Sequence, residues 1–194
     1  MKITAYLLIL CSFISFPEQS AAKPLYDTLV YFPETDSYYE LVSLSSQYPG
    51  RFGRNATGWQ EVNRLAVQRV RKSRRGRLAI VSSKKVHDFL RKTFRPEKPA
   101  WIGLRFFCKY NTAMWVNGQR IKPGDFRAWA NPWNLAEKHY SPTSPHRISC
   151  ANWNPVLPVH YWGIPEGFLW NGNVYTVHWS TFFVEYPAQN KSSE

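Results

Sequence analysis

Residues 131–167 limit most strongly what this chain can fold into. They contain six prolines and three tryptophans, and they show neither helical nor strand periodicity. Disordered chains contain few aromatic residues, so the tryptophans favour an ordered loop. An irregular loop of this length inside a compact domain usually carries function. The rest of the chain must therefore supply the regular framework that supports it.

Length and composition favour one domain around one core. The chain has 194 residues, of which 44% are hydrophobic, and this is enough for one substantial core but not for two. We expect the domain to span residues 36–187, followed by a flexible tail over residues 188–194.

The first 22 residues have the features of a signal peptide. Lys2 precedes an apolar run over residues 3–16, and the small residues at positions 20–22 suit cleavage by signal peptidase. The apolar run is shorter than the roughly 20 residues that a membrane-spanning helix needs. We therefore expect residues 1–22 to be removed and the protein to be secreted, into an extracellular or periplasmic space.

Hydrophobic periodicity predicts two helices. Thr57 and Gln60 have the spacing of a capping box, so the first helix should begin there. Ser82 or Ser83 can cap the second helix, and Pro96 limits it. The two apolar faces consist of Trp59, Val62, Leu65, Ala66 and Val70 in the first helix, and of Val86, Phe89, Leu90 and Phe94 in the second.

Strands dominate the rest of the chain. Residue composition predicts them at 36–44, 78–81, 101–107, 113–116, 119–121, 169–170 and 181–186. Asn117-Gly118 is typical of a two-residue hairpin turn, and Asn171-Gly172 suits a turn of the same kind. Two helices among strands of this order indicate an α+β fold.

Basic residues are densest between residues 69 and 77, in a chain whose formal net charge is +12. One interpretation of this segment is a solvated helix end, where cations complement the helix dipole. The other is an anion-binding patch that attracts sulfated glycan, an anionic envelope or lipid headgroups. Nucleic acid ranks below these partners because no nucleic-acid motif is present. The patch would consist of Arg71, Lys72, Arg74, Arg75 and Arg77, continued by Lys84, Lys85, Arg91 and Lys92 on the second helix.

The cysteines and histidines indicate no catalytic or zinc site. Cys108 and Cys150 remain after the signal peptide and could form one disulfide in an oxidising compartment, or could stay as two buried thiols. The chain has no zinc, nucleotide-binding or nucleophile motif, and its five histidines are dispersed. We therefore expect no enzyme, no cofactor and no membrane span.

Five short motifs in a fixed order resemble the C-type lectin-like domain. Trp101-Ile102-Gly103-Leu104 matches the W-I-G-L motif of that family. The others are Trp115-Val116-Asn117-Gly118 for W-x-x-G, Phe126-Arg127-Ala128-Trp129 for F-x-x-W, Trp170-Asn171-Gly172 for W-N-D, and Phe183-Val184-Glu185-Tyr186 for F-x-C-E-Y. The resemblance covers residues 38–186. It implies a C-type lectin-like fold, in which two helices pack on antiparallel sheets beside a long irregular loop region.

The chain departs from this family at its disulfides. Ala66 and Val184 stand where the family has one cysteine pair, and apolar side chains can fill the place of a buried disulfide. Cys150 matches one cysteine of the second pair, but Tyr175 stands in the place of its partner. A bridge between Cys108 and Cys150 is the substitute that we predict.

The family's calcium ligands are also missing. Sugar-binding members hold Ca²⁺ with E-P-N or Q-P-D and with the Asn-Asp of W-N-D, since Ca²⁺ needs several charged oxygen ligands. Here Asn131 and Trp133 flank Pro132, and Gly172 replaces the aspartate. We therefore expect no calcium site of the family type.

Aromatic and amide side chains in the loop region could still hold a sugar by stacking and hydrogen bonding. The candidate ligand-binding residues are Asn131, Trp133, Asn134, Asn152, Trp153, Trp162 and Asn171. The alternative for any one tryptophan is a place in the core, which we expect for Trp101, Trp115, Trp129 and Trp170. The chain is thus interpreted as a carbohydrate or cell-surface recognition module, and the alternative is a protein-protein interaction domain that uses the same loops and a basic face.

Overall fold

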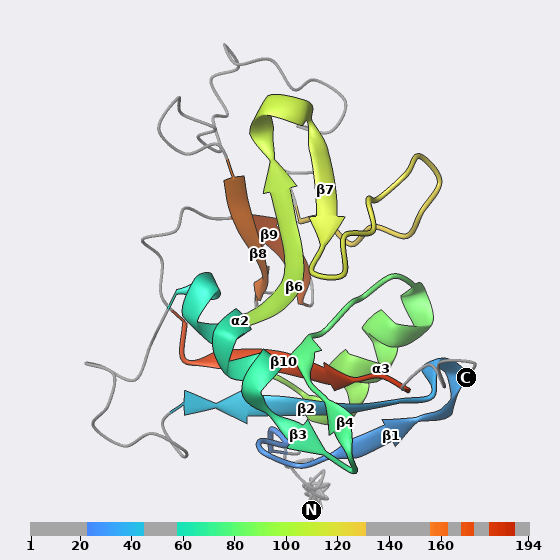
Figure 1. The fold of residues 1–194 in the computed structure, drawn as a ribbon, viewed down its shortest axis with the longest axis vertical. Helices are drawn as coiled ribbons and strands as arrows, with labels where there is room; N and C mark the ends of the chain where they lie inside the picture. The colour runs from blue at the N-terminus through green and yellow to red at the C-terminus, as the bar shows by residue number, and fades with distance from the viewer. Residues whose placement is uncertain (1–22, 45–57, 131–155, 163–167, 173–178, 189–194) are drawn as a thin grey trace, which may run out of the picture.

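The computed structural model describes residues 23–44, 58–130, 156–162, 168–172 and 179–188 (Figure 1). Its α-helices are α2 (Trp59–Gln68) and α3 (Lys84–Phe94), and short 3-10 helices lie at Pro33–Thr35 and Cys108–Tyr110. Its strands are β1 (Val30–Phe32), β2 (Ser37–Ser43), β3 (Val70–Arg71), β4 (Arg74–Arg75), β5 (Arg77–Leu78), β6 (Ala100–Phe107), β7 (Thr112–Trp115), β8 (Val156–Trp162), β9 (Leu169–Gly172) and β10 (Thr181–Tyr186). The predicted signal peptide lies outside the described residues.

One sheet joins the two ends of the chain. Its order is β1-β2-β10-β6-β8-β9, with β5 also paired to β10 and β7 to β6. The antiparallel pairing of β2 with β10 runs from Ser43↔Thr181 to Tyr38↔Tyr186. Strand β10 also runs parallel to the start of β6. The early strand, the terminal strand and the W-I-G-L strand are therefore neighbours, and β1 extends the sheet before the predicted domain start at residue 36.

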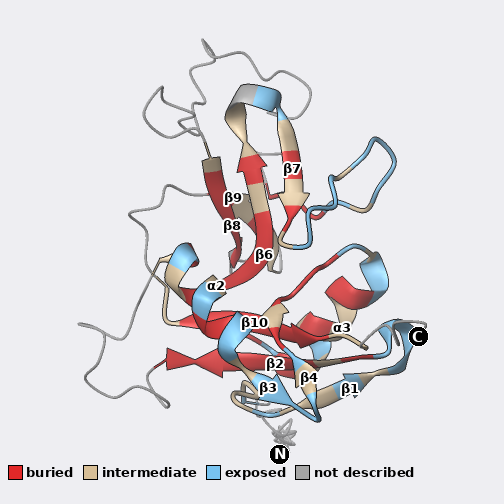
Figure 2. Ribbon diagram, viewed as in Figure 1, coloured by how far each residue is buried: buried red, intermediate tan, exposed pale blue. Residues whose placement is uncertain are grey.

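The two helices cover opposite faces of the β2–β10 pair. Alternate residues of a strand point to opposite faces. Phe182 and Val184 pack with the buried side of α2, whereas Phe183 packs with that of α3. Figure 2 shows buried residues along β2, β10, β6 and β8, with both helices turning buried residues toward them. This arrangement confirms the α+β class.

The predicted helix faces are mostly confirmed. Ser83 caps α3, since its Oγ accepts a hydrogen bond from the backbone N–H of Val86 at 3.2 Å. The predicted capping box at Thr57 is wrong, because the N-cap of α2 is Gly58, which has no side chain to cap the helix. Val70 is also not a core residue, since α2 ends at Gln68 and Val70 is 54% exposed in β3.

Gly103 of the W-I-G-L motif lies where three segments meet. Its N–H donates to the carbonyl of Ala79 at 2.9 Å, and its carbonyl accepts from the N–H of Val116 at 2.8 Å. A Cβ atom here would lie 2.7 Å from the carbonyl oxygen of Leu78 and 2.9 Å from Val116 Cγ2. Only glycine allows the backbone of β6 to approach its neighbours this closely.

Two predictions for the second half of the chain need correction. Residues 156–162 are not irregular but form β8, which pairs with both β6 and β9. Pro158 is tolerated there because it lies opposite Arg105, at the edge of a register shift where the ladder is already interrupted. Asn171-Gly172 is not a turn, since both residues belong to β9. By contrast, Asn117-Gly118 is the predicted turn, with φ of 86° at Gly118.

The close approach at Gly103 leads to a stability prediction. Gly103→Ala should lower the free energy of unfolding by about 3 kcal/mol, because backbone carbonyls cannot swing away as a side chain can. Gly124→Asn is the control, since Gly124 has φ of 88° with nothing within 4 Å of an added Cβ. Asparagine tolerates that backbone conformation, so its cost should stay below about 1 kcal/mol. Urea unfolding measures both, and equal costs would contradict the close-approach argument.

Candidate functional site

The basic segment between residues 69 and 77 forms a β-hairpin. Strand β3 pairs with β4 through Val70↔Arg75 and Arg71↔Arg74. The turn residues Lys72 and Ser73 both have positive φ, at 50° and 59°, as a tight hairpin turn requires. The interpretation as a solvated helix end is therefore wrong, because the chain leaves the helix at Arg69 in an extended conformation.

Arg69, at the start of this segment, neutralises a buried glutamate on the α2 face of the sheet. Its Nη2 lies 2.8 Å from Glu40 Oε1, and Glu40 is 1% exposed. The hydroxyl of Tyr186 donates to Glu40 Oε2 at 2.6 Å and accepts from Arg69 Nε at 3.1 Å. Burial and the hydrogen bond to Glu40 raise the pKa of Tyr186 above its ordinary value. The carboxylate is thus compensated by a cation and a phenol from two other elements.

Arg77, at the other end of the segment, neutralises Glu185 on the α3 face. Its Nε and Nη2 each donate to the carboxylate at 3.1 Å. Ser37 Oγ and the N–H of Ile80 donate to the same group at 3.2 and 3.1 Å. Four donors occupy the acceptor positions of a carboxylate, so Glu185 is left with no role as a base or metal ligand.

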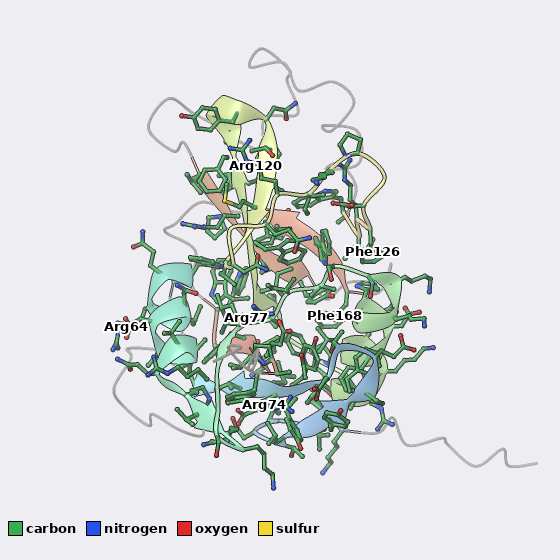
Figure 3. The ribbon with its side chains drawn as sticks, turned by 45° about the vertical axis from the view of Figure 1, so that its right-hand side comes forward. Arg64, Arg74, Arg77, Arg120, Phe126 and Phe168 are labelled. Carbon is green, nitrogen blue, oxygen red and sulfur yellow. The ribbon has the colours of Figure 1, made fainter. Side chains whose placement is uncertain are left out.

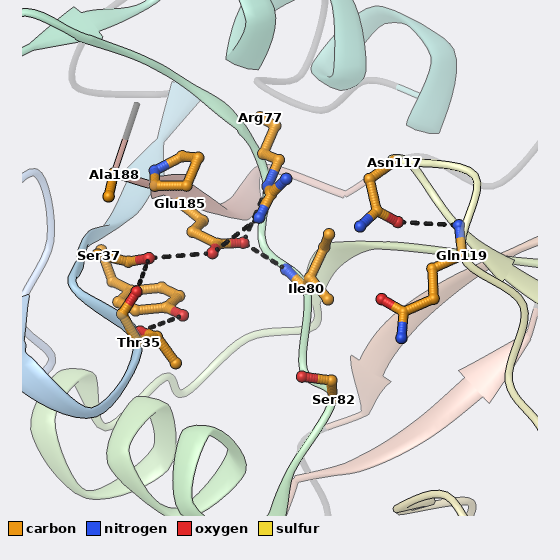
Figure 4. A pocket seen from close by; sticks show the side chains of 11 residues that line it. Thr35, Ser37, Arg77, Ile80, Ser82, Asn117, Gln119, Glu185 and Ala188 are labelled. Atoms are coloured by element: carbon orange, nitrogen blue, oxygen red, sulfur yellow. Dashed lines mark hydrogen bonds and ion pairs between the residues drawn. The ribbon is translucent and has the colours of Figure 1, made fainter. Parts of the chain in front are cut away.

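The Arg77–Glu185 pair forms one wall of a polar hollow of ≈ 330 Å³ (Figure 4). Asn117 and Gln119, from the turn after β7, lie across from the pair. Ser82 lines the hollow between them. Because Glu185 cancels the charge of Arg77, the hollow carries no net charge from this pair and does not select an anion.

Arg74 connects the β3–β4 hairpin to the start of β2. Its Nη2 lies 3.0 Å from Asp36 Oδ1, and its guanidinium lies over the Tyr38 ring at 5.2 Å from the ring centroid. The hydrogen bond from Arg74 lowers the pKa of Asp36. Figure 3 shows Arg77 near the centre of the molecule, Arg74 lower down and Arg64 out on α2.

The predicted basic patch is therefore smaller than its sequence suggests. Arg74 and Arg77 form ion pairs with Asp36 and Glu185, and the exposed Arg71 lies 3.8 Å from Glu40, while Lys72 and Arg75 are exposed on the hairpin. The hairpin shares the α2 face of the sheet with Tyr38, whereas α3 packs on the other face. On α3, Lys84 and Lys85 pair with Asp88 and Glu34. Ion pairs on the hairpin segment and on α3 thus reduce the positive charge of the predicted patch.

Tryptophans form the interior beside the loop region, as predicted. Trp170 is fully buried and meets the rings of Trp115, Trp129 and Phe126 edge to face, at centroid distances of 5.6, 5.5 and 5.7 Å. The backbone N–H of Trp170 donates to the carbonyl of Ala128 at 2.6 Å, and its backbone carbonyl accepts from the N–H of Ala130 at 2.9 Å. Trp101, Trp115, Trp129 and Trp170 are all core residues. Their side chains are therefore parts of the core and not of an exposed surface.

Strand β9 carries the position at which the calcium-binding family members have Asn-Asp. Asn171 is half-buried opposite His160, and Gly172 is buried opposite Val159. No carboxylate is available at Gly172, and no group of three or more His, Cys, Asp or Glu side chains in the described part of the chain could hold a metal ion. The residues present do not fit the calcium site that the resemblance implies.

The structure describes two of the candidate ligand-binding residues. Trp162 in β8 and Asn171 in β9 lie on paired strands, next to the loop segments in sequence. The other candidates, Asn131, Trp133, Asn134, Asn152 and Trp153, lie outside the described residues and stay predictions. Cys108 is disulfide-bonded. Its predicted partner, Cys150, also lies outside the described residues, so the pairing remains a prediction.

Sequence reasoning missed two buried histidines. His87 of α3 is 5% exposed, and its Nδ1 lies 2.9 Å from the hydroxyl of Tyr161. His160 is fully buried, with its ring 5.3 Å from Trp101 and 5.1 Å from Trp179. Burial lowers the pKa of His87 to about 4 and that of His160 to about 3. The spacing of His87 with Leu90 and Phe94 on one helical face was the available signal.

Comparison with known proteins finds similarity in structure and not in sequence. No family model and no curated protein matches this chain. The cow C-type carbohydrate-recognition domain of CD23, solved in the presence of an oligosaccharide, is 17% identical, with a TM-score of 0.53 over 87% of this chain and 100% of that one. The Ca²⁺-independent C-type lectin SPL-2 from Saxidomus purpuratus is 16% identical, with a TM-score of 0.53 over 84% and 94%. The C-type lectin domain of murine dendritic cell inhibitory receptor 2, in complex with an N-glycan, is 11% identical, with a TM-score of 0.54 over 84% and 99%.

No helix in the part of the chain that the structure describes is long and apolar enough to cross a membrane.

The buried ion pair of Glu185 leads to a second stability prediction. Glu185→Ala should lower the free energy of unfolding by about 3–5 kcal/mol, because it leaves the Arg77 guanidinium and the Ile80 N–H without their acceptor. Glu34→Ala is the control, since Glu34 forms an exposed ion pair with Lys85. That substitution should cost less than about 1 kcal/mol. Urea unfolding at neutral pH compares the two, and a small loss for Glu185→Ala would show that the pair is not structural.

The two buried histidines predict a loss of stability in acid. Their pKa values are depressed in the folded state, so below the ordinary pKa of 6.5 only the unfolded chain takes up these protons. The free energy of unfolding should fall as pH drops from about 6.5 toward about 4 for His87, and on toward about 3 for His160. His87→Gln, which can keep a bond to Tyr161, should flatten this slope by up to about 1.4 kcal/mol per pH unit. Urea unfolding between pH 5 and 7, the window given by these pKa shifts, measures the slope, and parallel curves would contradict the assignment.

Proposed function

We propose that this chain, which has the C-type lectin-like fold, is a secreted module that recognises carbohydrate without calcium of the family type. The fold agrees with the expectation from the sequence motifs. The described helices and mixed sheet match C-type lectin domains over most of their length. Secretion is part of the proposal and rests on the signal-peptide pattern of residues 1–22.

One observation carries the proposal. The chain shares its fold, over 84% of its length, with a lectin described as Ca²⁺-independent, and the buried Gly172 of β9 leaves it without the family's calcium carboxylate. Other structural neighbours were solved with N-acetylglucosamine or with an N-glycan. Recognition of sugar on this scaffold therefore does not require the ligands that this chain lacks.

The proposed binding surface lies where β8 and β9 lead into the loop segments. Trp162 and Asn171 belong to these strands, and Trp133, Trp153, Asn131, Asn134 and Asn152 come from the loops. Aromatic faces can stack on the apolar faces of sugar rings, and amide groups both donate and accept hydrogen bonds. Trp170 of β9 packs edge to face against Trp115 and Trp129, and this buried cluster holds β9 in place. The second candidate function is binding of a protein partner through the same loops, favoured by the exposed Arg71, Lys72 and Arg75 of the hairpin.

A glycan array tests the proposal. We expect glycan binding that persists with chelator, and an at least tenfold loss of affinity in the double variant Trp133→Ala, Trp153→Ala, on the order of one or two stacking contacts. Tyr110→Ala is the control, because Tyr110 is a 67% exposed aromatic residue in the connection between β6 and β7. Millimolar Ca²⁺ should leave the melting temperature unchanged, since a bound ion stabilises the folded state.

The outcomes separate the two candidate functions. Glycan binding that chelator abolishes contradicts the calcium-free mechanism. Binding that disappears only at raised salt assigns recognition to the basic hairpin, because exposed charges are screened. An array without any hit favours the protein partner.

A further inference from the structure

Arg105 in β6 differs from the arginines that hold the fold together. Arg64, Arg69, Arg74 and Arg77 each form an ion pair with a carboxylate. The Arg105 side chain is half-buried, and it forms neither a hydrogen bond nor an ion pair with the residues that the structure describes. Other arginines without an acceptor, such as Arg75 and Arg95, are exposed and solvated. Arg105 is thus a partly desolvated cation without a counter-charge.

Two aromatic rings hold the Arg105 guanidinium in place. Its Cζ lies 5.0 Å from the ring centroid of Trp59 and 5.3 Å from that of Phe107. Trp59 is itself fixed, since it is 3% exposed and its indole N–H donates to the carbonyl of Ile102 at 2.8 Å. Cations are attracted to ring faces, and arginine stacks on them without using its N–H donors. The rings therefore orient the group while its donors stay unused.

The shielded Nε of Arg105 shows that this arrangement is incomplete. This nitrogen is buried from solvent and has no hydrogen-bond partner among the residues that the structure describes. A buried donor without an acceptor is costly, and nearly all such groups in proteins have a hydrogen-bond partner from the protein or from ordered water. The edge of a guanidinium presents parallel N–H groups that match two oxygens of a carboxylate, sulfate or phosphate. An oxyanion would supply the missing acceptor and the missing charge together.

We propose that Arg105, held between Trp59 and Phe107, binds an oxyanion group, a carboxylate or a sulfate, of an acidic ligand. The site lies on β6 beside the first residue of α2 and uses none of the loop residues of the proposed sugar surface, so it goes beyond the proposed function. The net charge of +12 attracts such ligands from a distance, and Arg105 selects the group that docks.

The test observes the Arg105 side chain directly. The Nε–H resonance of Arg105 is followed by NMR in the full chain, titrated with sodium sulfate against sodium chloride at equal ionic strength. A second pair of titrations uses methyl glucuronide against methyl glucoside. We expect a saturable shift with sulfate, glucuronide or both, and none with chloride or glucoside. A response to sulfate alone identifies a sulfate site, and a response to glucuronide alone identifies a carboxylate site.

Variants confirm where the oxyanion binds. Arg105→Met keeps an apolar stem between the rings and should abolish saturable binding, followed through the indole resonance of Trp59. Arg105→Lys, which keeps the charge and loses the paired donors, should weaken binding roughly tenfold. Arg95→Met, at an exposed arginine after α3, should bind as the unsubstituted chain does. Shifts that stay linear, or equal affinity in Arg105→Met, overturn the proposal. Neither result depends on the glycan array, so this site and the proposed function fail or succeed separately.

Discussion

The antiparallel pairing of β2 with β10, with one buried glutamate on each face, is the constraint on which the rest of the structure depends. Glu40 faces α2 and Glu185 faces α3. Two carboxylates taken out of water need cations nearby, since an unpaired buried charge would cost more than the net stability of most domains can offset. Arg69 and Arg77 supply these cations from the two ends of one short segment. That segment must therefore pass from one face of the strand pair to the other. Between Arg69 and Arg77 it forms the hairpin of β3 and β4.

The basic segment shows why charge patterns are hard to interpret from sequence. A run of cations in the sequence suggests an exposed basic surface, but the positions of the buried carboxylates decide which of these cations turn inward. Glu40 and Glu185 each lie in an apolar strand, in YYELV and FFVEY, and a lone acid in such a pattern is the signal that a buried counter-charge exists. Arg105 was missed for a different reason. Its neighbours Trp59 and Phe107 come from α2 and the far end of β6, and no local pattern brings them together.

The sequence correctly predicted those elements that depend on residues close together in the chain. Both helices, the cap at Ser83 and strand β10 follow from periodicity and capping patterns, whereas the buried positions of Trp101, Trp115 and Trp129 follow from the family motifs. The dipeptide Asn-Gly suits a turn at two places in the sequence, but it forms a turn at only one of them. Asn117-Gly118 is itself exposed and forms a turn after β7, whereas Asn171-Gly172 is part of a strand because it pairs with β8. That pairing joins residues 159–162 to residues 169–172, in a stretch where the sequence shows no strand periodicity, so the sequence pattern does not predict it. The candidate site stays a prediction, since only Trp162 and Asn171 among its residues lie on described strands.

The missing family disulfide shows how this chain links the same elements by other means. Ala66 of α2 and Val184 of β10, at the positions of that cysteine pair, are fully buried and converge on Gly76, where an added Cβ would lie 2.5 Å from the Ala66 carbonyl and 3.0 Å from Val184 Cγ1. A disulfide there would contribute about 2–4 kcal/mol, mainly by restricting the unfolded chain. Arg69, the C-cap of α2, instead bonds Tyr186 of β10 and Glu40 of β2. A hydrogen-bonded ion pair and close packing thus connect the helix to the terminal strand in the folded state only. Unlike a disulfide, this link leaves the unfolded chain unrestricted, so the fold relies on native contacts at the positions where the sequence resemblance would place a cysteine pair.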